Sequence, residues 1–176
     1  HYLKSYDALA AQAPAALNQL VQANRDLSDQ FKLRNAYIHG DCKVNNLLFA
    51  AETDQVIAII DFDTAMYGHW AWDFGDLVRS VCFSTGSVSR DYFSACLVGF
   101  AQHQRQATLK DVVAAPAYVT LMLGVRFLTD HLQGDTYFKV HKHGENLVRA
   151  QQQFDLFEQF LARRRDFRAA AELVLG

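Results

Sequence analysis

The sequence predicts an α+β fold that is mostly α-helical. Apolar residues recur every three or four positions from about residue 89 onward, as they do in amphipathic helices. Two apolar runs, residues 47–50 and 56–60, are separated by a short polar segment, which is typical of a β-hairpin. With 51% hydrophobic residues, two prolines and nine glycines, the 176-residue chain has the composition of one helix-rich domain or lobe with a real core.

The first 33 residues are expected to be helical. Pro14 can occupy the first turn of the second helix, where its missing N–H costs little. This stretch contains no phosphate-binding loop and no lysine on a strand. The apolar residues expected to share one face are Leu9, Ala13, Leu17, Leu20, Val21, Ala23 and Leu27.

The open end of the expected hairpin is rich in polar residues. Asn46 immediately precedes the first strand, and Asp61 follows the second. Because the start of one hairpin strand lies beside the end of the other, these two residues should be neighbours. We therefore expect one polar site made of a catalytic loop, residues 39–46, and a metal loop, residues 61–63.

The spacing of these polar residues suits phosphoryl transfer. Asp41 would orient the attacking hydroxyl and accept its proton, while Asn46 and Asp61 would hold Mg²⁺ against the phosphates of a nucleotide. Two roles stay open. Lys43 would meet the γ-phosphate or pair with Asp41, and Asp63 would bind a second Mg²⁺ or support the site by hydrogen bonding.

A simpler interpretation is that the His-Gly-Asp segment is only a turn. Gly40 would then supply a positive φ, and Asp41 would cap the following segment. A lysine, an asparagine, two strands and a second aspartate follow in the expected order. Polar groups at both mouths of an apolar hairpin are costly without a ligand, so this order favours the catalytic interpretation.

An Asp-Phe-Gly sequence at residues 73–75 imitates the metal motif of protein kinases. Asp61 lies 20 residues after Asp41, as expected for two loops joined by one hairpin. Asp73 lies 32 residues after Asp41 and follows no apolar strand. We therefore predict that Asp61 is the metal ligand and that Asp73 caps a helix.

Helices are expected to follow the metal loop. Residues 64–70 should form a loop that pivots at Gly68, and Gly124 should permit a close contact between helices. The expected helices cover residues 71–81, a segment opened by Ser89, residues 109–132 with Gly134 at the end, and residues 146–161. Arg126, Asp130 and Tyr137 interrupt apolar surroundings, and the first two are spaced for an ion pair on one helix face.

The chain resembles a known family. Its segments H-G-D-C-K-V-N-N-L-L-F and I-I-D-F-D are similar to the catalytic and metal loops of the aminoglycoside phosphotransferase and choline kinase superfamily. A closer resemblance, over residues 30–160, is to the N-acetylhexosamine 1-kinases. It includes W-D-F-G-D-L-V-R-S and R-F-L-T-D-H-L-Q-G-D-T-Y-F-K.

The resemblance implies that residues 1–176 form a protein-kinase-like C-terminal lobe with a small catalytic hairpin. ATP and Mg²⁺ would be required, and the anomeric hydroxyl of an N-acetylhexosamine would be phosphorylated. Such kinases carry their nucleotide-gripping lysine on an N-terminal β-lobe, which is absent from this sequence. We therefore expect the chain to need that lobe as a partner and to be inactive alone.

The resemblance also implies roles for individual residues. The helices over about residues 89–162 would bind the sugar, through Arg126, Tyr137 and Asp130, with Arg79 a weaker candidate. His39 and Asp73 would be structural supports, with Asp73 tethering the catalytic loop.

Two alternatives stay open. One is an aminoglycoside or other small-molecule kinase, although the region of residues 108–160 carries charges of both signs. The other is a non-catalytic, pseudokinase-like binding module, which only the missing lobe favours.

Charge and composition limit the partners and the compartment. A formal charge of −2 predicts no attraction to nucleic acid or to an anionic membrane. No uninterrupted apolar stretch reaches eighteen residues and no signal sequence opens the chain, so we expect a cytoplasmic protein.

The cysteines and two of the histidines are not expected to form a disulfide or a metal site. Cys42, Cys82 and Cys96 are expected to be free thiols, with Cys42 as a small apolar filler. His141 and His143 flank one lysine and are expected at the surface rather than on zinc.

Overall fold

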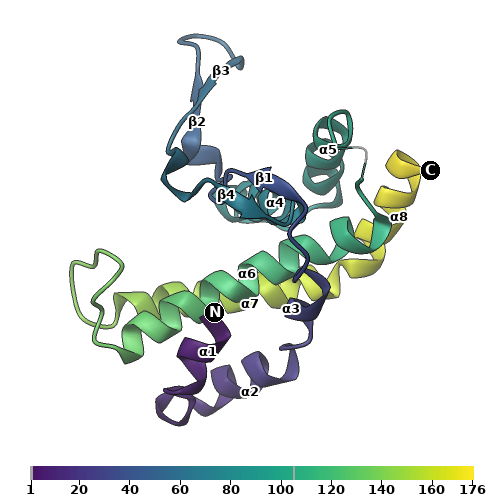
Figure 1. The fold of residues 1–176 in the computed structure, drawn as a ribbon. Helices are drawn as coiled ribbons and strands as arrows, with labels where there is room; N and C mark the ends of the chain where they lie inside the picture. The colour runs from purple at the N-terminus through teal and green to yellow at the C-terminus, as the bar shows by residue number, and fades with distance from the viewer. Residues whose placement is uncertain (1, 105) are drawn as a thin grey trace.

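The computed structural model describes residues 2–104 and 106–176 as a helical body from which a β-hairpin projects (Figure 1). The predicted class, α+β and mostly helical, is confirmed. The elements in chain order are α1 (Tyr2–Asp7), η1 (Ala10–Gln12), α2 (Ala15–Ala23), α3 (Leu27–Gln30), β1 (Ala36–Ile38), η2 (Val44–Asn46), β2 (Leu47–Phe49), β3 (Val56–Ile59), η3 (Phe62–Thr64), β4 (Met66–Gly68), α4 (Ala71–Thr85), α5 (Arg90–Ala101), α6 (Leu109–Leu132), α7 (Glu145–Ala162) and α8 (Arg164–Leu175).

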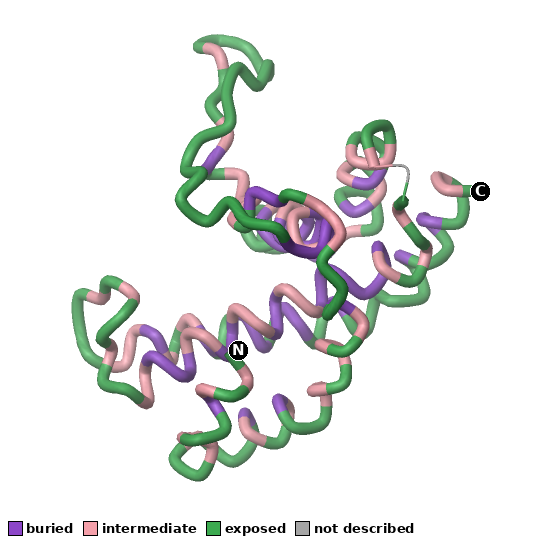
Figure 2. The backbone as a smooth tube through the Cα atoms, viewed as in Figure 1, coloured by how far each residue is buried: buried purple, intermediate pink, exposed green. Residues whose placement is uncertain are grey.

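The predicted hairpin is present. Strand β2 pairs antiparallel with β3, with Leu47 opposite Ile59 and a bulge between Leu48 and Phe49. The hairpin stands away from the helices and is exposed along most of its length (Figures 1 and 2). Apolar side chains on both strands therefore face solvent in this structure.

A second small sheet corrects the expected loop at residues 64–70. Strand β4 pairs antiparallel with β1, and Ala36 lies opposite Gly68. Each strand has three residues, too few for an alternating pattern to be recognised in the sequence. This sheet joins the start of the catalytic loop to the segment that follows the metal loop.

The N-terminal stretch also differs from expectation. Turns divide it into α1, η1, α2 and α3, so one continuous apolar face does not form. Leu17 and Val21 of α2 are buried, whereas Leu9 and Ala13 flank η1 and are half-buried. The later helices fit the prediction well: Ser89 caps α5, and α6 has the expected bounds.

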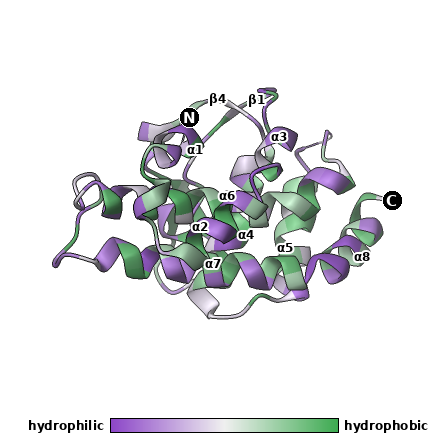
Figure 3. Cartoon of the chain, turned by 90° about the horizontal axis from the view of Figure 1, so that it is seen from below, coloured by the Kyte–Doolittle hydropathy of each residue, from purple (hydrophilic) through white to green (hydrophobic). Residues whose placement is uncertain are grey.

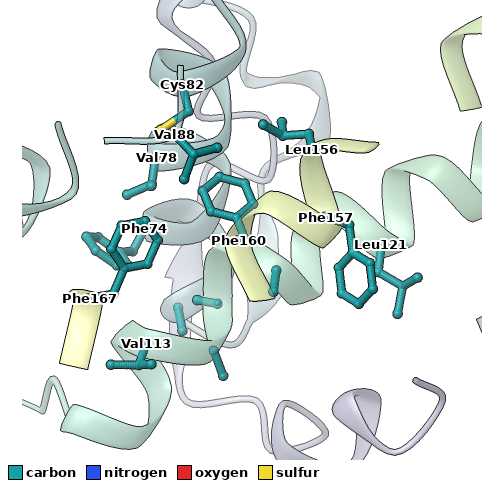
Figure 4. Close-up of a cluster of buried hydrophobic side chains, with 14 of the residues drawn as sticks. Phe74, Val78, Cys82, Val88, Val113, Leu121, Leu156, Phe157, Phe160 and Phe167 are labelled. Carbon is teal, nitrogen blue, oxygen red and sulfur yellow. The ribbon is translucent and has the colours of Figure 1, made fainter. Parts of the chain in front are cut away.

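Helix α6 forms the centre of the body and packs against α1, α4, α7 and α8. It is long and apolar enough to cross a membrane by length and composition, but 67% of its most apolar window is buried inside the protein, as in a core helix. Hydrophobic and hydrophilic residues alternate along α7 and α8 (Figure 3), whose apolar sides complete the core (Figure 4).

Glycine allows α4 to approach α6 closely. A Cβ atom on Gly75, the glycine of the Asp-Phe-Gly sequence, would lie 2.6 Å from the backbone oxygen of Ala115. Gly124 plays the expected part between α6 and α7, because a Cβ atom there would lie 2.6 Å from the Phe154 ring. The Asp-Phe-Gly glycine therefore serves helix packing.

Gly75→Ala is expected to lower the free energy of unfolding by about 1–3 kcal/mol, because the backbone of α6 must shift to admit the methyl group. Gly99→Ala is the matched control. Gly99 lies within α5 with open space around it, so alanine should raise stability by about 0.5–1 kcal/mol. Urea denaturation measures both changes. Equal effects of the two substitutions would contradict the close approach of α4 and α6.

His69 fastens the start of α4. Its Nδ1 accepts a hydrogen bond of 3.1 Å from the Ala71 N–H, and its ring packs edge-on against Phe31. Burial lowers the pKa of His69, and the charge of Asp111 only partly opposes this effect. The folded protein therefore favours the neutral imidazole, which alone can accept this hydrogen bond.

Because the folded-state pKa lies below the unfolded value of about 6.5, the stabilisation by His69 is complete above pH 6.5 and is lost as the pH falls from there through the folded-state pKa. His69→Gln should flatten this part of the pH dependence of the unfolding free energy. His103→Gln, at an exposed position, should leave it unchanged. Denaturation at pH 7.5 and 5.5 measures both, and an unaltered slope in His69→Gln would contradict the assignment.

Candidate active site

The catalytic loop begins with a turn that requires glycine. Gly40 has a φ of +81°, and a Cβ atom there would lie 2.7 Å from the backbone oxygen of Thr64. The positive φ of the simpler interpretation is therefore real. The turn also brings the catalytic loop against the metal loop, so the two interpretations of His-Gly-Asp are compatible.

Helix α4 anchors the catalytic loop at two points. The Asp73 carboxylate accepts hydrogen bonds from the backbone N–H groups of His39, at 2.7 Å, and Gly40, at 2.8 Å. Further along, the Ser80 hydroxyl accepts one from the Val44 N–H at 2.9 Å. Both Asp73 oxygens accept hydrogen bonds from the loop, so this aspartate tethers the loop to α4. It lies in the first turn of α4 rather than at the N-cap, which is Trp70 and makes no side-chain capping bond.

His39 joins the two loops. Its Nε2 lies 2.9 Å from the Ile60 carbonyl oxygen, which can only accept, so Nε2 carries the proton. Its own carbonyl accepts a hydrogen bond of 2.9 Å from the Thr64 hydroxyl, and its ring packs against Phe62. The side chain is buried, as suits a support residue.

Asp41, Lys43 and Asn46 form one network. The Lys43 ammonium lies 2.5 Å from Asp41 Oδ2, and the Asn46 amide nitrogen lies 3.1 Å from the same oxygen. The Asn46 amide also donates to the Asp41 carbonyl at 2.9 Å. These contacts fix the Asp41 carboxylate. Pairing with Asp41 is one of the two roles predicted for Lys43.

The predicted neighbourhood of Asn46 and Asp61 is present. The Ile60 N–H donates to the Asn46 carbonyl at 3.0 Å, which places Asp61 beside the catalytic loop. Asp61 adopts a left-handed conformation with φ +69° and ψ +55°. For a residue other than glycine this is strained, and such strain is concentrated at functional sites.

The donor atoms present here fit Mg²⁺. The Lys43 ammonium lies 2.5 Å from Asp41 and 3.8 Å from Asp61, so the two carboxylates lie close enough together to share one positively charged group. The amide nitrogen of Asn46 donates to Asp41, which leaves its Oδ1 as the atom able to bind a cation. Oxygen atoms from Asn46 and Asp61 are the ligands that Mg²⁺ prefers.

Asp63 lies exposed within η3. Strand β3 ends at Ile59, so the alternation of an extended strand does not apply to residues 61–63. A second-metal or supporting role for Asp63 stays a prediction.

The expected sugar-binding residues lie at the α6–α7 connection, apart from Arg79. Among the described residues Asp130 accepts five hydrogen bonds, from three backbone N–H groups of the connection, from the Thr136 hydroxyl and from the Asn146 amide. The three N–H groups are those of Thr136, Tyr137 and Phe138. Asp130 therefore shapes this connection. Arg126 and Asp130 do not form an ion pair among the described residues.

Arg126 instead lies over aromatic rings. Its guanidinium carbon is 4.8 Å from the Tyr2 ring centroid, 5.3 Å from that of Phe138 and 6.0 Å from that of Tyr137. The side chain of Tyr137 is 74% exposed and can contact a ligand. Arg79 is buried and pairs with Asp76 at 2.8 Å, so its guanidinium is already engaged within the helical body.

Cys42 lies beside the site without the character of a nucleophile. Burial raises the pKa of its thiol, and the carboxylates of Asp73 and Asp76 raise it further. The thiol therefore stays protonated near neutral pH and fits the expected role of a filler.

Sequence reasoning missed Ser80 and Thr64, whose hydroxyl groups fix the two loops. Ser80 lies 36 residues from its partner Val44, and a serine within a helix gives no signal of such a contact. Thr64 directly follows the Asp-Phe-Asp segment, and that position is the one available hint.

A helical body with an acidic and amide site at the open end of a hairpin is compatible with a kinase-like fold. The sequence profile of the phosphotransferase enzyme family (APH) matches residues 1–109 of this chain, which is more than half of its length. The chain belongs to this phosphotransferase family. The matched region includes the catalytic loop, the metal loop and Asp73, whereas Arg126, Asp130 and Tyr137 lie beyond it.

Asp73→Asn is expected to loosen the catalytic loop, because an amide group cannot accept both N–H groups without turning its own NH₂ toward one of them. The amide protons of His39 and Gly40 should exchange faster with solvent, by a factor corresponding to about 2 kcal/mol. Hydrogen exchange followed by NMR measures this. Asp166→Asn, at an exposed site on α8, is the control. Unchanged exchange at both loop amides would show that the tether is dispensable.

Proposed function

We propose that this phosphotransferase uses ATP and Mg²⁺ to phosphorylate a sugar hydroxyl, with the anomeric hydroxyl of an N-acetylhexosamine as the preferred acceptor. The meeting of Asp41, Lys43, Asn46 and Asp61 at the open end of the hairpin is the observation that carries the proposal. Phosphoryl transfer depends on positioning and charge neutralisation, and this arrangement supplies both.

In this proposal Asp41 is the catalytic base. Lys43 and Asn46 both bond to Oδ2, which leaves Oδ1 to accept the proton of the attacking hydroxyl. Asn46 and Asp61 would hold Mg²⁺, which neutralises charge on the phosphate oxygens when bound. Lys43 is close enough to both aspartates to contact the transferred phosphate as well.

The exposed hairpin supports binding of a nucleotide and of a further lobe. Large apolar side chains are exposed on and beside its strands; they include Leu48, Phe49, Val56, Ile57, Ile59, Ile60 and Phe62. An apolar surface of this extent is typical of a binding face. We propose that the nucleotide base and a nucleotide-binding lobe cover it, and that residues 1–176 without such a lobe turn over poorly.

The sugar would bind near the α6–α7 connection. Arg126 offers hydrogen-bond donors to hydroxyl or acetamido oxygen atoms, and Tyr137 offers an exposed ring, with Asp130 fixing the backbone between them. An aminoglycoside is polycationic, and a guanidinium at this position would repel it. Arg126 therefore favours the sugar over the aminoglycoside alternative.

A non-catalytic binding module is the alternative of another class. Such modules commonly lose the base or a metal ligand, and Asp41, Asn46 and Asp61 are all in place here. We also propose a cytoplasmic location, which the three free thiols support because they persist in reducing compartments.

The test is transfer of phosphate from ATP to a panel of N-acetylhexosamines, hexoses and aminoglycosides by the full-length protein. Asp41→Asn should reduce kcat by about 10²–10⁴-fold and leave the affinity for the sugar nearly unchanged, since a base acts mainly in the transition state. Asp54→Asn, in the exposed hairpin loop, should keep full activity. If Asp41→Asn were as active as the unaltered protein, Asp41 would not be the catalytic base. If the unaltered protein transferred phosphate to none of the acceptors, the non-catalytic binding module would be favoured.

A further inference from the structure

Three potential metal ligands converge at the end of α6, within the segment that connects it to α7. His143 Nδ1 lies 2.9 Å from Asp135 Oδ2, and His131 Nδ1 lies 3.7 Å from Asp135 Oδ1. The ligand atoms of the three side chains all lie within 4.8 Å of one another. Residues separated by twelve positions in the chain thus point at one small volume.

The spacing of these atoms suits a tetrahedral ion. Ligand atoms about 2.0–2.2 Å from a tetrahedral Zn²⁺ stand roughly 3.3 Å apart. The two separations from the Asp135 carboxylate lie on either side of that value. The His143 side chain is 78% exposed, so its ring has room to adjust to an ion.

The carboxylate is held by its own supporting contacts. The Gly144 N–H donates to Asp135 Oδ2 at 3.1 Å, and the Asn146 amide donates to Oδ1 at 3.0 Å. Each oxygen keeps a second lone pair for an ion. Such outer contacts orient the ligands of metal sites.

Asp135 is rigidly placed. The residue adopts a left-handed backbone, with φ +59°. Its carboxylate is thus fixed beside two histidines before any ion binds.

His131 shows the clearest need for a ligand. Its Nδ1 is buried and has no hydrogen-bond partner among the described residues, and 3.7 Å to Asp135 is too long for such a bond. An unpaired buried nitrogen is costly, and a metal ion would satisfy it. Two imidazoles with one carboxylate suit Zn²⁺ rather than Mg²⁺ or Ca²⁺, which prefer oxygen ligands alone.

We propose that His131, Asp135 and His143 bind a Zn²⁺ ion that fastens the α6–α7 connection. The His143 side chain is 78% exposed, so the fourth coordination position opens to solvent and would hold water. The ion would tie the end of α6 to His143, two residues before α7 begins, across the segment that carries Tyr137. This site is separate from the proposed magnesium site and does not depend on the proposed function.

The test is metal binding by the protein after chelator treatment. Zn²⁺ should bind with one equivalent and raise the Tm, and Co²⁺ should give the visible absorption of a four-coordinate site. His143→Ala, at an exposed position that should not disturb folding, should weaken Zn²⁺ binding by at least about 100-fold and abolish the Co²⁺ spectrum.

His141→Ala is the matched control. His141 is exposed, two residues from His143 and outside the cluster, so this variant should bind Zn²⁺ as the unaltered protein does. Circular dichroism verifies that both variants are folded. The proposal is overturned if the unaltered protein and His143→Ala bind Zn²⁺ with equal affinity. It is also overturned if the unaltered protein binds no Zn²⁺ at micromolar concentration, in which case His143 and Asp135 form only an ion pair.

Discussion

The antiparallel pairing of β2 with β3 is the constraint on which the site depends. It sets Asn46, the residue before β2, beside Ile60, the residue after β3. Asp61 follows directly and so lies next to the catalytic loop, although fifteen positions separate it from Asn46 in the chain. A slip of the register by one residue would turn each side chain to the opposite face and separate them. The hydrogen bond from Ile60 to Asn46 continues the pairing up to the candidate site.

A hairpin that projects into solvent cannot hold this geometry unaided, since an isolated two-stranded sheet is marginal in water. The helical body supplies the support. Asp73 and Ser80 on α4 hold the catalytic loop, while His39 bonds to the metal loop. The buried core around α6 is therefore linked to the site through α4. Within this link the aspartate of the Asp-Phe-Gly sequence accepts hydrogen bonds from the catalytic loop.

The sequence allowed much of this to be predicted, because the controlling signals were local. The hairpin, the bounds of α6 and the meeting of Asn46 and Asp61 follow from apolar periodicity and from strand order. The pairing of β1 with β4 did not, since strands of three residues carry no recognisable pattern. The contacts of Ser80 and Thr64 also arise only when distant segments fold together.

The proposed sugar-binding region was harder to predict. Arg126 and Asp130 have the spacing of an ion pair, yet aromatic rings surround Arg126 and backbone N–H groups occupy Asp130. Local spacing could not reveal that competition, because the partners come from the following connection, from α7 and, for Arg126, also from Tyr2 of α1. The proximity of His131 to His143 could not be predicted for the same reason. In the sequence it is indicated only by the four-residue step from His131 to Asp135.

Paramagnetic broadening by Mn²⁺ tests the central geometry most directly. Mn²⁺ replaces Mg²⁺ at oxygen sites, and His143→Ala provides a background in which the second cluster lacks a ligand. With a nucleotide present, the amide signals of residues 41–46 and 60–63 should broaden together, and those of α8 should stay sharp. Broadening of only one of the two loops, or of neither, would contradict a metal site shared between the ends of the hairpin.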